Sequence, residues 1–278
     1  MLIRVAHSPD SDDAFMFYAL ASGQIDTGDL EYVHELQDIE TLNRRALHGE
    51  LEVTAVSIHA YAYLADRYAL LGSGSSMGDG YGPRLVATSP APADPRAAIA
   101  GARIAIPGTM TTAYLALRLY QPDFEPVVMP FDQIEDAVLR GEVPYGLLIH
   151  EGQLTYADIG LHLWAEMGAW WLEDTGLPLP LGGNVVRRDL GPEVLAQVAR
   201  DLKASIEFSL AHRAQALSHA KQYNRGISDE RTDTFVGMYV NHWTVDYGAR
   251  GREAVQLLLD RGFERGVIPK KVTVEFIG

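Results

Sequence analysis

Short apolar runs alternate with segments of helical periodicity along most of this chain. Runs such as Leu2–Ala6, Val53–Val56 and Arg103–Ile106 have the length of buried strands, and a segment with helical spacing of apolar residues follows each one. Strands that alternate with helices in this way usually form parallel sheets covered by helices. The sequence therefore predicts an α/β fold.

The expected elements can be placed along the chain by residue range. Strands are expected at Leu2–Ala6, Leu30–Leu36, Val53–Val56, Leu85–Thr88, Arg103–Ile106, Pro126–Met129, Tyr145–Ile149 and Asn184–Arg187, and Ala169–Trp171 is expected to finish the second group of strands. Helices are expected from the Ser8–Asp13 junction to Ser22 and at Ile39–Leu47, Ile58–Ala65, Thr111–Tyr120 and Gln133–Arg140. After Pro192 only helices are expected, at Pro192–Ala211, Ala214–Lys221, Asp229–Val240 and Arg250–Arg265.

Two stretches rich in glycine or proline, Gly72–Pro83 and Leu177–Gly183, interrupt this order. Such composition is typical of connections rather than of regular elements. We expect the chain to pass there between a larger lobe of residues 1–83 and 182–278 and a smaller lobe of residues 84–181. The crossings would lie near residues 80–84 and 177–183. The sequence thus predicts a clamshell with mixed sheets and a helical C-terminal region.

A faint internal repeat agrees with two lobes. Arg45–Val53 and Ala137–Tyr145 both read as a helix end, a Gly-Glu pair and a strand. Aligning the two glycines brings Ser57 within one residue of the position equivalent to His150. The alternative is that glycine after a helix is common at helix ends in general. Both explanations stay open at this point.

Charge and composition exclude several classes of protein. The 278 residues carry a formal net charge of −14, which disfavours nucleic acids and anionic membranes as partners. No apolar run is long enough to cross a bilayer, and the N-terminus lacks the apolar segment of a signal peptide. The absence of cysteine excludes disulfides, thiolate nucleophiles and Cys-bound metal sites. We expect a cytoplasmic protein with a small-molecule partner, and the oligomeric state stays open.

His150 is the strongest candidate for a catalytic residue. The apolar run Leu147–Ile149 leads directly into it, and polar residues and a glycine follow. Side chains at the carboxyl ends of strands face the ligand crevice of α/β folds. An imidazole has an ordinary pKa of roughly 6.5 and accepts protons readily at neutral pH. His150 is therefore predicted to be a general base, and the alternative is a structural histidine bonded to backbone.

Three junctions between an expected strand and the next helix carry hydroxyl groups. They contain Ser8 and Ser11, Ser57, and the group Thr109, Thr111 and Thr112. A helix N-terminus presents unpaired N–H groups and partial positive charge, which suit a carboxylate or phosphate. The alternative for each hydroxyl is that it only caps its own helix. Taken together, the junctions predict a cleft that binds a small carboxylated ligand without lysine or arginine.

Other motifs do not point to a cofactor or metal. Asp10, Asp12 and Asp13 resemble the start of a calcium loop, but the later ligands are missing and helix capping is favoured. The glycines of Gly72–Gly82 lack the lysine and hydroxyl of a phosphate-binding loop, so a flexible crossing is favoured. Trp170 and Trp171 have the ring surface to stack on a ligand, with core packing as the alternative. We predict no metal and no cofactor.

The chain resembles the 1,4-dihydroxy-6-naphthoate synthase family of the futalosine route to menaquinone. The resemblance is carried by Asp38–Arg44, Pro107-Gly108 with Thr111–Tyr114, Leu148–Glu151 with Thr155-Tyr156, and Gly168–Trp171 together with Thr175–Gly182. It implies a two-lobed fold similar to type II periplasmic solute-binding proteins. It also implies a carbon–carbon lyase that converts cyclic dehypoxanthine futalosine to 1,4-dihydroxy-6-naphthoate without a redox cofactor.

The resemblance also implies roles for individual residues. The histidine of its Ile-His-Glu motif, which is the base in the family, falls on His150. The expected substrate-binding positions are Ser8, Asn43, Ala55, Val56, Ser57, Thr111, Thr112 and Ala113.

Two departures from the family pattern keep alternatives open. The family often reads Ser-Pro-Cys-Pro-Asn-Asp where this chain has Ser8–Asp13, and some members carry a lysine where this chain has Ala55. One alternative activity is chorismate dehydratase, which shares the fold and the pathway. Another is a solute-binding protein that binds a small anion and catalyses nothing.

Overall fold

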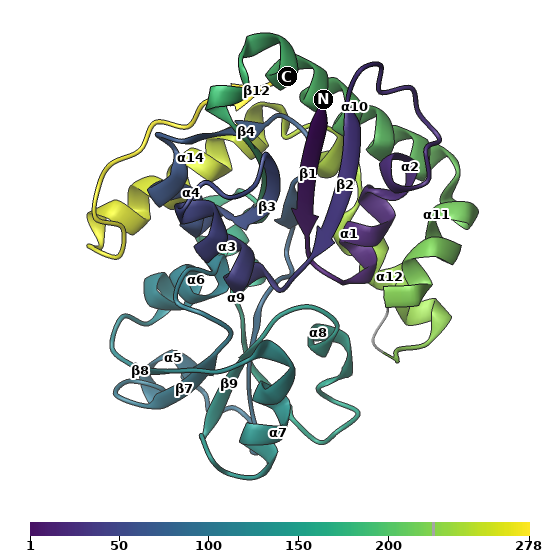
Figure 1. Ribbon diagram of the computed structural model, residues 1–278. Coiled ribbons are helices and arrows are strands. Elements are labelled where there is room, and N and C mark those ends of the chain that lie inside the picture. The colour runs from purple at the N-terminus through teal and green to yellow at the C-terminus, as the bar shows by residue number, and fades with distance from the viewer. Residues whose placement is uncertain (224–225) are drawn as a thin grey trace.

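The computed structural model describes residues 1–223 and 226–278, and their strands form two separate sheets (Figure 1). The larger sheet has the order β12-β4-β11-β3-β1-β2, with β5 paired to β11. Its strands are β1 (Leu2–His7), β2 (Glu31–Leu36), β3 (Val53–Ser57), β4 (Tyr68–Leu71), β5 (Ser76–Gly78), β11 (Leu179–Arg187) and β12 (Phe276–Ile277). β1 runs parallel to β2 and β3, whereas β11 is antiparallel to β3 and β4.

The smaller sheet has the order β10-β6-β9-β7-β8. It comprises β6 (Arg84–Ala87), β7 (Arg103–Ile106), β8 (Glu125–Val128), β9 (Tyr145–Leu148) and β10 (His162–Glu166). β7 is parallel to β8 and β9, and β6 is antiparallel to β9 and β10. The prediction of an α/β fold with mixed sheets is therefore confirmed.

Helices cover both sheets. Those before the smaller sheet are α1 (Ser11–Met16), α2 (Tyr18–Ala21), α3 (Ile39–Leu47) and α4 (Ile58–Leu64). Between β6 and β11 the chain forms α5 (Pro95–Ala98), α6 (Thr112–Tyr120), α7 (Ile134–Leu139), α8 (Gly152–Thr155) and α9 (Met167–Thr175). The C-terminal part contributes α10 (Pro192–Ala211), α11 (Arg213–Ala220), α12 (Asp229–Tyr239), α13 (His242–Val245) and α14 (Gly248–Glu264).

The chain leaves the larger sheet after Gly78 and returns to it at Leu179. Between these points it forms every strand of the smaller sheet. We propose that the lobes divide as 1–83 with 182–278 and as 84–181, because the two connections lie close to these limits.

Several elements differ from the sequence prediction. Ala169–Trp171 lies inside α9, and the C-terminal region contains the short strand β12 in addition to helices. β4, β5 and β10 were not predicted. β5 has only three residues and interrupts the glycine-rich stretch Gly72–Pro83, most of which is buried or half-buried. Strands this short, or paired at a sheet edge as β10 is, carry too few residues to show a clear periodicity.

One hydrophobic cluster joins the two sheets. It contains Val56 and Leu70 from the larger sheet together with Leu85 and Ile104 from the smaller one, all fully buried. Trp171 of α9 belongs to the same cluster. A second cluster lies on the other face of the larger sheet, where Val5 and Leu71 pack with residues of α10 such as Leu202. The two lobes therefore share packed apolar surface.

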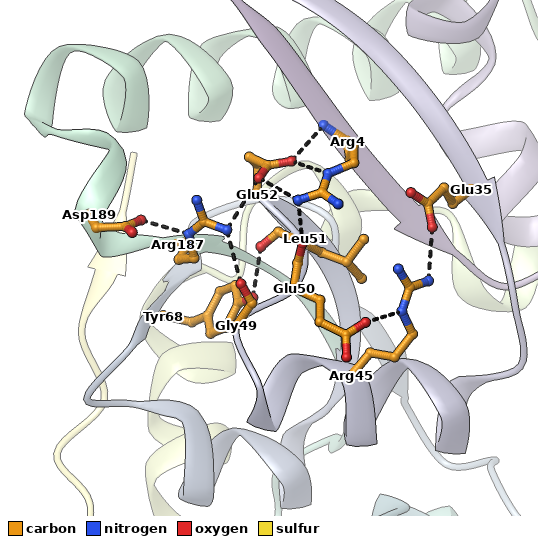
Figure 2. Close-up of polar contacts among 10 residues, drawn as sticks. All are labelled: Arg4, Glu35, Arg45, Gly49, Glu50, Leu51, Glu52, Tyr68, Arg187 and Asp189. Atoms are coloured by element: carbon orange, nitrogen blue, oxygen red, sulfur yellow. Dashed lines mark hydrogen bonds and ion pairs between the residues drawn. The ribbon is translucent and has the colours of Figure 1, made fainter.

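An ionic network holds the strands of the larger sheet together (Figure 2). Glu52, directly before β3, accepts a hydrogen bond from Arg4 Nε of β1 at 2.8 Å and one from Arg187 Nη1 of β11 at 3.2 Å. Nearby, Arg45 pairs with Glu35 of β2 at 2.8 Å and with Glu50 at 2.9 Å. These contacts lie where β3 begins, so they leave its carboxyl end available for other contacts.

Candidate active site

A cavity lies where elements of both sheets meet. The empty space inside it, counted out through its open mouth, is about 740 Å³. Ser8 follows β1, and Ala55, Val56 and Ser57 end β3. From the other lobe come Thr111, Thr112 and Ala113, where α6 starts after β7, and His150, which follows β9. All of these residues lie at or just after the carboxyl end of a strand. Because β1 is parallel to β3, and β7 is parallel to β9, the residues of each pair of strands lie at the same edge of their sheet.

Among the expected substrate-binding positions, Asn43 is the one that does not line the described cavity, and the junction hydroxyls of Ser11 and Thr109 also lie outside its lining. It is fully buried on α3, where its Nδ2 donates to Ser57 Oγ at 3.0 Å and its Oδ1 accepts from the Ser57 N–H at 2.9 Å. Ser57 makes no side-chain cap for α4. Asn43 therefore fixes the orientation of Ser57 at the cavity wall.

The two threonines at the start of α6 are engaged within the protein. Thr111 Oγ1 caps α6 by accepting from the Tyr114 N–H, and it donates to the Gly108 carbonyl. Thr112 Oγ1 donates to the Leu181 carbonyl at 2.6 Å and accepts from the His59 N–H at 3.1 Å. The groups left to meet an anion are therefore the N–H groups of the first helical turn, which have no partner within an α-helix.

His150 lies two residues before α8 and has an unusual backbone conformation. Its φ of 54° is the one positive value among the described residues other than glycine. Its Nδ1 lies 2.9 Å from Asp10 Oδ2, and its ring packs edge-on against Phe131 with centroids 4.7 Å apart. Strained backbone of this kind is retained where surrounding contacts fix it, and it is common at functional sites.

Three aspartates gather beside this histidine. Asp10, Asp12 and Asp13 are all buried, and one carboxylate oxygen of each lies within 4.8 Å of the others. Desolvation, followed by the charge of Asp10, raises the pKa of Asp12 and of Asp13 well above the ordinary value. A hydrogen bond to Asp10 raises the pKa of Asp12 further. Asp12 is therefore held protonated. Oxygen ligands in this spacing suit a hard cation, but the cluster alone does not establish a metal site.

The structure corrects the assignment of these aspartates to helix capping. Asp10 is at the N-cap position of α1, yet its side chain makes no cap hydrogen bond and contacts His150 instead. Asp13 Oδ2 accepts a hydrogen bond at 2.7 Å from the N–H of Ser8, a residue that lies before the helix. The side chain of Asp10 is thus directed across the cavity to the imidazole, and the helix N–H groups do not bind it.

Sequence reasoning missed several residues of the cavity wall, among them Tyr239 and Gln153. The hydroxyl of Tyr239 on α12 is hydrogen-bonded to the side-chain amide of Gln153 on α8 at 2.6 Å, and both residues are buried. Burial raises the pKa of Tyr239, so its hydroxyl stays protonated. Gln153 lies close after His150 and belonged to a stretch already singled out. Tyr239 comes from a distant helix of ordinary pattern, so no local signal marks it.

Neither neighbouring tryptophan lines the described cavity. Trp171 is fully buried and donates its indole N–H to the Pro178 carbonyl at 3.2 Å. Trp170 packs edge-on against Tyr120. Packing is thus the role that the structure gives to both tryptophans.

None of the described residues that line the cavity is lysine or arginine, so His150 is the one side chain there able to become cationic.

A sequence model of a family described as menaquinone biosynthesis matches residues 3–264. A 1,4-dihydroxy-6-naphtoate synthase from Thermus thermophilus is 42% identical over 266 residues, which cover 95% of each chain. The enzyme of the same name from Streptomyces coelicolor is 39% identical over 277 residues, covering 96% of this chain and 95% of the relative.

Solved structures with the same fold agree with this match. A protein from Archaeoglobus fulgidus superposes with a TM-score of 0.91 at 49% identity, covering 96% of this chain and 98% of that one. The periplasmic aliphatic sulphonate binding protein SsuA from Escherichia coli superposes with a TM-score of 0.65 at 14% identity, covering 98% and 89%. The expected periplasmic-binding-protein-like fold is therefore confirmed.

Among the helices of the described residues, none is long and apolar enough to cross a membrane. The family match spans residues 3–264, and the two relatives cover 95% and 96% of this chain. The chain belongs to the 1,4-dihydroxy-6-naphthoate synthase family of menaquinone biosynthesis.

Proposed function

We propose that this chain is a carbon–carbon lyase that converts cyclic dehypoxanthine futalosine to 1,4-dihydroxy-6-naphthoate, with His150 as the base. The names of the two relatives support the product. The observation that carries the proposal is the position of His150, which lines the shared cavity and is 14% exposed through its side chain. Its Nδ1 is paired with Asp10, whereas Nε2 makes no hydrogen bond or ion pair with another described residue.

The chemistry needs a proton acceptor and a place for negative charge. Breaking a carbon–carbon bond next to an acidic proton begins when a base removes that proton. Nε2 of His150 accepts it in our proposal. The electron pair freed by this proton transfer completes the aromatic ring as the carbon–carbon bond to the sugar-derived part breaks. That part leaves with the electron pair of the broken bond and takes up a proton, so the reaction is redox neutral and needs no redox cofactor.

The opposite side of the cavity would hold the substrate carboxylate. The N–H groups at the start of α6, around Thr112 and Ala113, are fixed by the Thr111 cap before any ligand arrives. Donors fixed in advance need no reorganisation during the reaction, so they stabilise developing charge effectively. These N–H donors would bind the carboxylate in place of lysine or arginine, neither of which lies in the described cavity wall.

The proposal is tested with His150→Ala. Turnover should fall by about 10²–10⁴-fold, the usual contribution of a general base, while substrate affinity changes little. Product formation is followed by naphthoate absorbance, and affinity by isothermal titration calorimetry. His48→Ala is the matched control because His48 is an exposed histidine outside the cavity, and it should react at the wild-type rate.

Other outcomes would reject the assignment in distinct ways. A His150→Ala variant with near wild-type turnover would exclude the histidine as base. Wild-type protein that binds the cyclic substrate without forming the naphthoate would be a binding protein. Wild-type protein that instead consumes chorismate would be a chorismate dehydratase.

A further inference from the structure

We propose that Asp10 is a positioning residue, which holds the imidazole of His150 as the Nδ1–H tautomer and directs Nε2 toward the substrate. The inference deepens the proposed function and rests on it for the role of His150 as base. It assigns to the first strand-to-helix junction a task that the sequence pattern did not suggest.

The contact between the two side chains is short and shielded. Asp10 Oδ2 lies 2.9 Å from His150 Nδ1, and the side chains are 3% and 14% exposed respectively. An ionised carboxylate only accepts hydrogen bonds, so Nδ1 must carry the hydrogen. The neutral ring then has its lone pair on Nε2, which is the atom that accepts a proton from the substrate.

Other contacts leave the ring little freedom to turn away. Phe131 packs against one edge at a centroid distance of 4.7 Å and an interplanar angle of 62°. The backbone of His150 is held in the left-handed region, which fixes the direction of its side chain. Phe131 and the backbone thus fix the position of the ring, and the Asp10 carboxylate sets its tautomer and its rotation.

The neighbouring acids allow Asp10 to keep its charge. Asp10 is the carboxylate that contacts the imidazole. Burial and the charge of Asp10 raise the pKa of Asp12 and of Asp13, which favours the neutral forms of these two neighbours. When Nε2 takes the substrate proton, the imidazolium forms beside this carboxylate and Nδ1–H remains in its hydrogen bond. The proton stays on the ring, and Asp10 offsets the new positive charge without accepting a proton.

Asp10→Asn tests the assignment because it keeps the size of the side chain and removes the charge. The amide can donate to Nδ1 and so favour the wrong tautomer, an effect that costs about 10⁴-fold in kcat where a buried aspartate serves a catalytic histidine in serine proteases. We expect kcat to fall by roughly 10²–10⁴-fold with KM changed by less than about threefold. Asp132→Asn, at an exposed position beside Phe131, is the matched control and should retain wild-type kcat.

The tautomer itself is read by ¹⁵N NMR of histidine-labelled protein, with the His150 signals assigned from their loss in His150→Gln. The wild type should show a protonated Nδ1 and an unprotonated Nε2, and Asp10→Asn should show a shift toward the Nε2–H form. A wild type with Nε2–H, or an Asp10→Asn variant with unchanged tautomer and kcat, would overturn the inference.

This measurement separates the inference from the proposed function. If His150→Gln keeps its turnover, the histidine is not the base, although the spectra still decide whether Asp10 sets the tautomer. If His150 is the base, adding Asp10→Asn to His150→Gln should cause no further loss of turnover, because the aspartate acts through the ring. If Asp10→Asn does not fold, the wild-type spectrum alone decides.

Discussion

At the scale of single residues, the site depends on where buried carboxyl groups find partners. His150 was predicted from the apolar run that precedes it, and the structure places it at the cavity. Its partner Asp10 was assigned to a helix cap, because the pairing joins segments far apart in sequence and no local pattern encodes it. Residues that act through a tertiary contact are those that sequence reasoning misses.

The protonated state of Asp12 predicts an unusual pH dependence of stability. Its pKa is raised in the fold, chiefly by desolvation, so the folded state binds more protons than the unfolded state above the ordinary aspartate pKa of about 4. Wild-type stability should therefore be lost as the pH rises from there. Asp12→Asn removes the titration, and its free energy of unfolding relative to wild type should increase by about 1 kcal/mol or more between about pH 4.5 and pH 8.

Urea unfolding at a series of pH values measures this difference. Asp132→Asn removes a carboxyl from an exposed position and should follow the wild-type curve throughout. Parallel curves for Asp12→Asn and the wild type would show that Asp12 is not held protonated by the fold.

At the scale of elements, the sequence located strands and helices that carry strong periodicity. The ranges Ile39–Leu47, Arg103–Ile106 and Pro192–Ala211 agree with the structure at both ends. β10 was missed because it is a short edge strand with an irregular register between Leu163 and Ala165. Ala169–Trp171 was misplaced because aromatic residues favour strands in general, whereas here they lie in α9, with Trp171 buried and Trp170 half-buried against Tyr120.

The glycines of the internal repeat also have an element-level explanation. Gly49 and Gly141 both adopt φ near 70°, at 69° and 71°, directly after α3 and α7. A left-handed residue at this position ends a helix and favours glycine. The shared Gly-Glu pattern is thus accounted for by helix termination, whether or not the lobes arose by duplication.

Glu52 should be important for the stability of the larger sheet. It joins β1, β3 and β11 through Arg4 and Arg187, and the hydrogen bond from Arg4 is the main cause that lowers its pKa. We expect Glu52→Gln to cost about 1–3 kcal/mol of unfolding free energy at neutral pH. A lowered pKa stabilises the fold above the ordinary pKa of about 4.3 and ceases to do so as the pH falls through the folded value.

The difference between Glu52→Gln and wild type should therefore shrink below about pH 4 in urea titrations. Glu142→Gln is the control because it removes a carboxylate that pairs with Arg140 on an exposed surface, where such pairs contribute less than about 1 kcal/mol. Equal losses for the two variants, or a difference that does not vary with pH, would contradict the role of this network.

At the scale of the whole molecule, the lobes are joined by packing and by specific hydrogen bonds. The apolar cluster that contains Val56 and Ile104 spans both sheets. Thr112 adds a polar connection, since its hydroxyl links the start of α6 to β11 and to the start of α4. The sequence predicted Thr112 at the cavity from its place at a helix start, but it gave no sign that the hydroxyl connects the lobes.

This connection makes Thr112 a test of how the lobes are held together. Thr112→Val keeps the shape of the side chain but leaves the buried His59 N–H and the half-buried Leu181 carbonyl without their hydroxyl partner. Each buried polar group left unpaired costs about 1–3 kcal/mol, so the free energy of unfolding in urea should fall by at least about 1 kcal/mol. Thr112→Ser retains the hydroxyl and should lose less than Thr112→Val. If the two variants were equally stable, the hydroxyl would contribute nothing to the joint, and the lobes would be held by the shared apolar core alone.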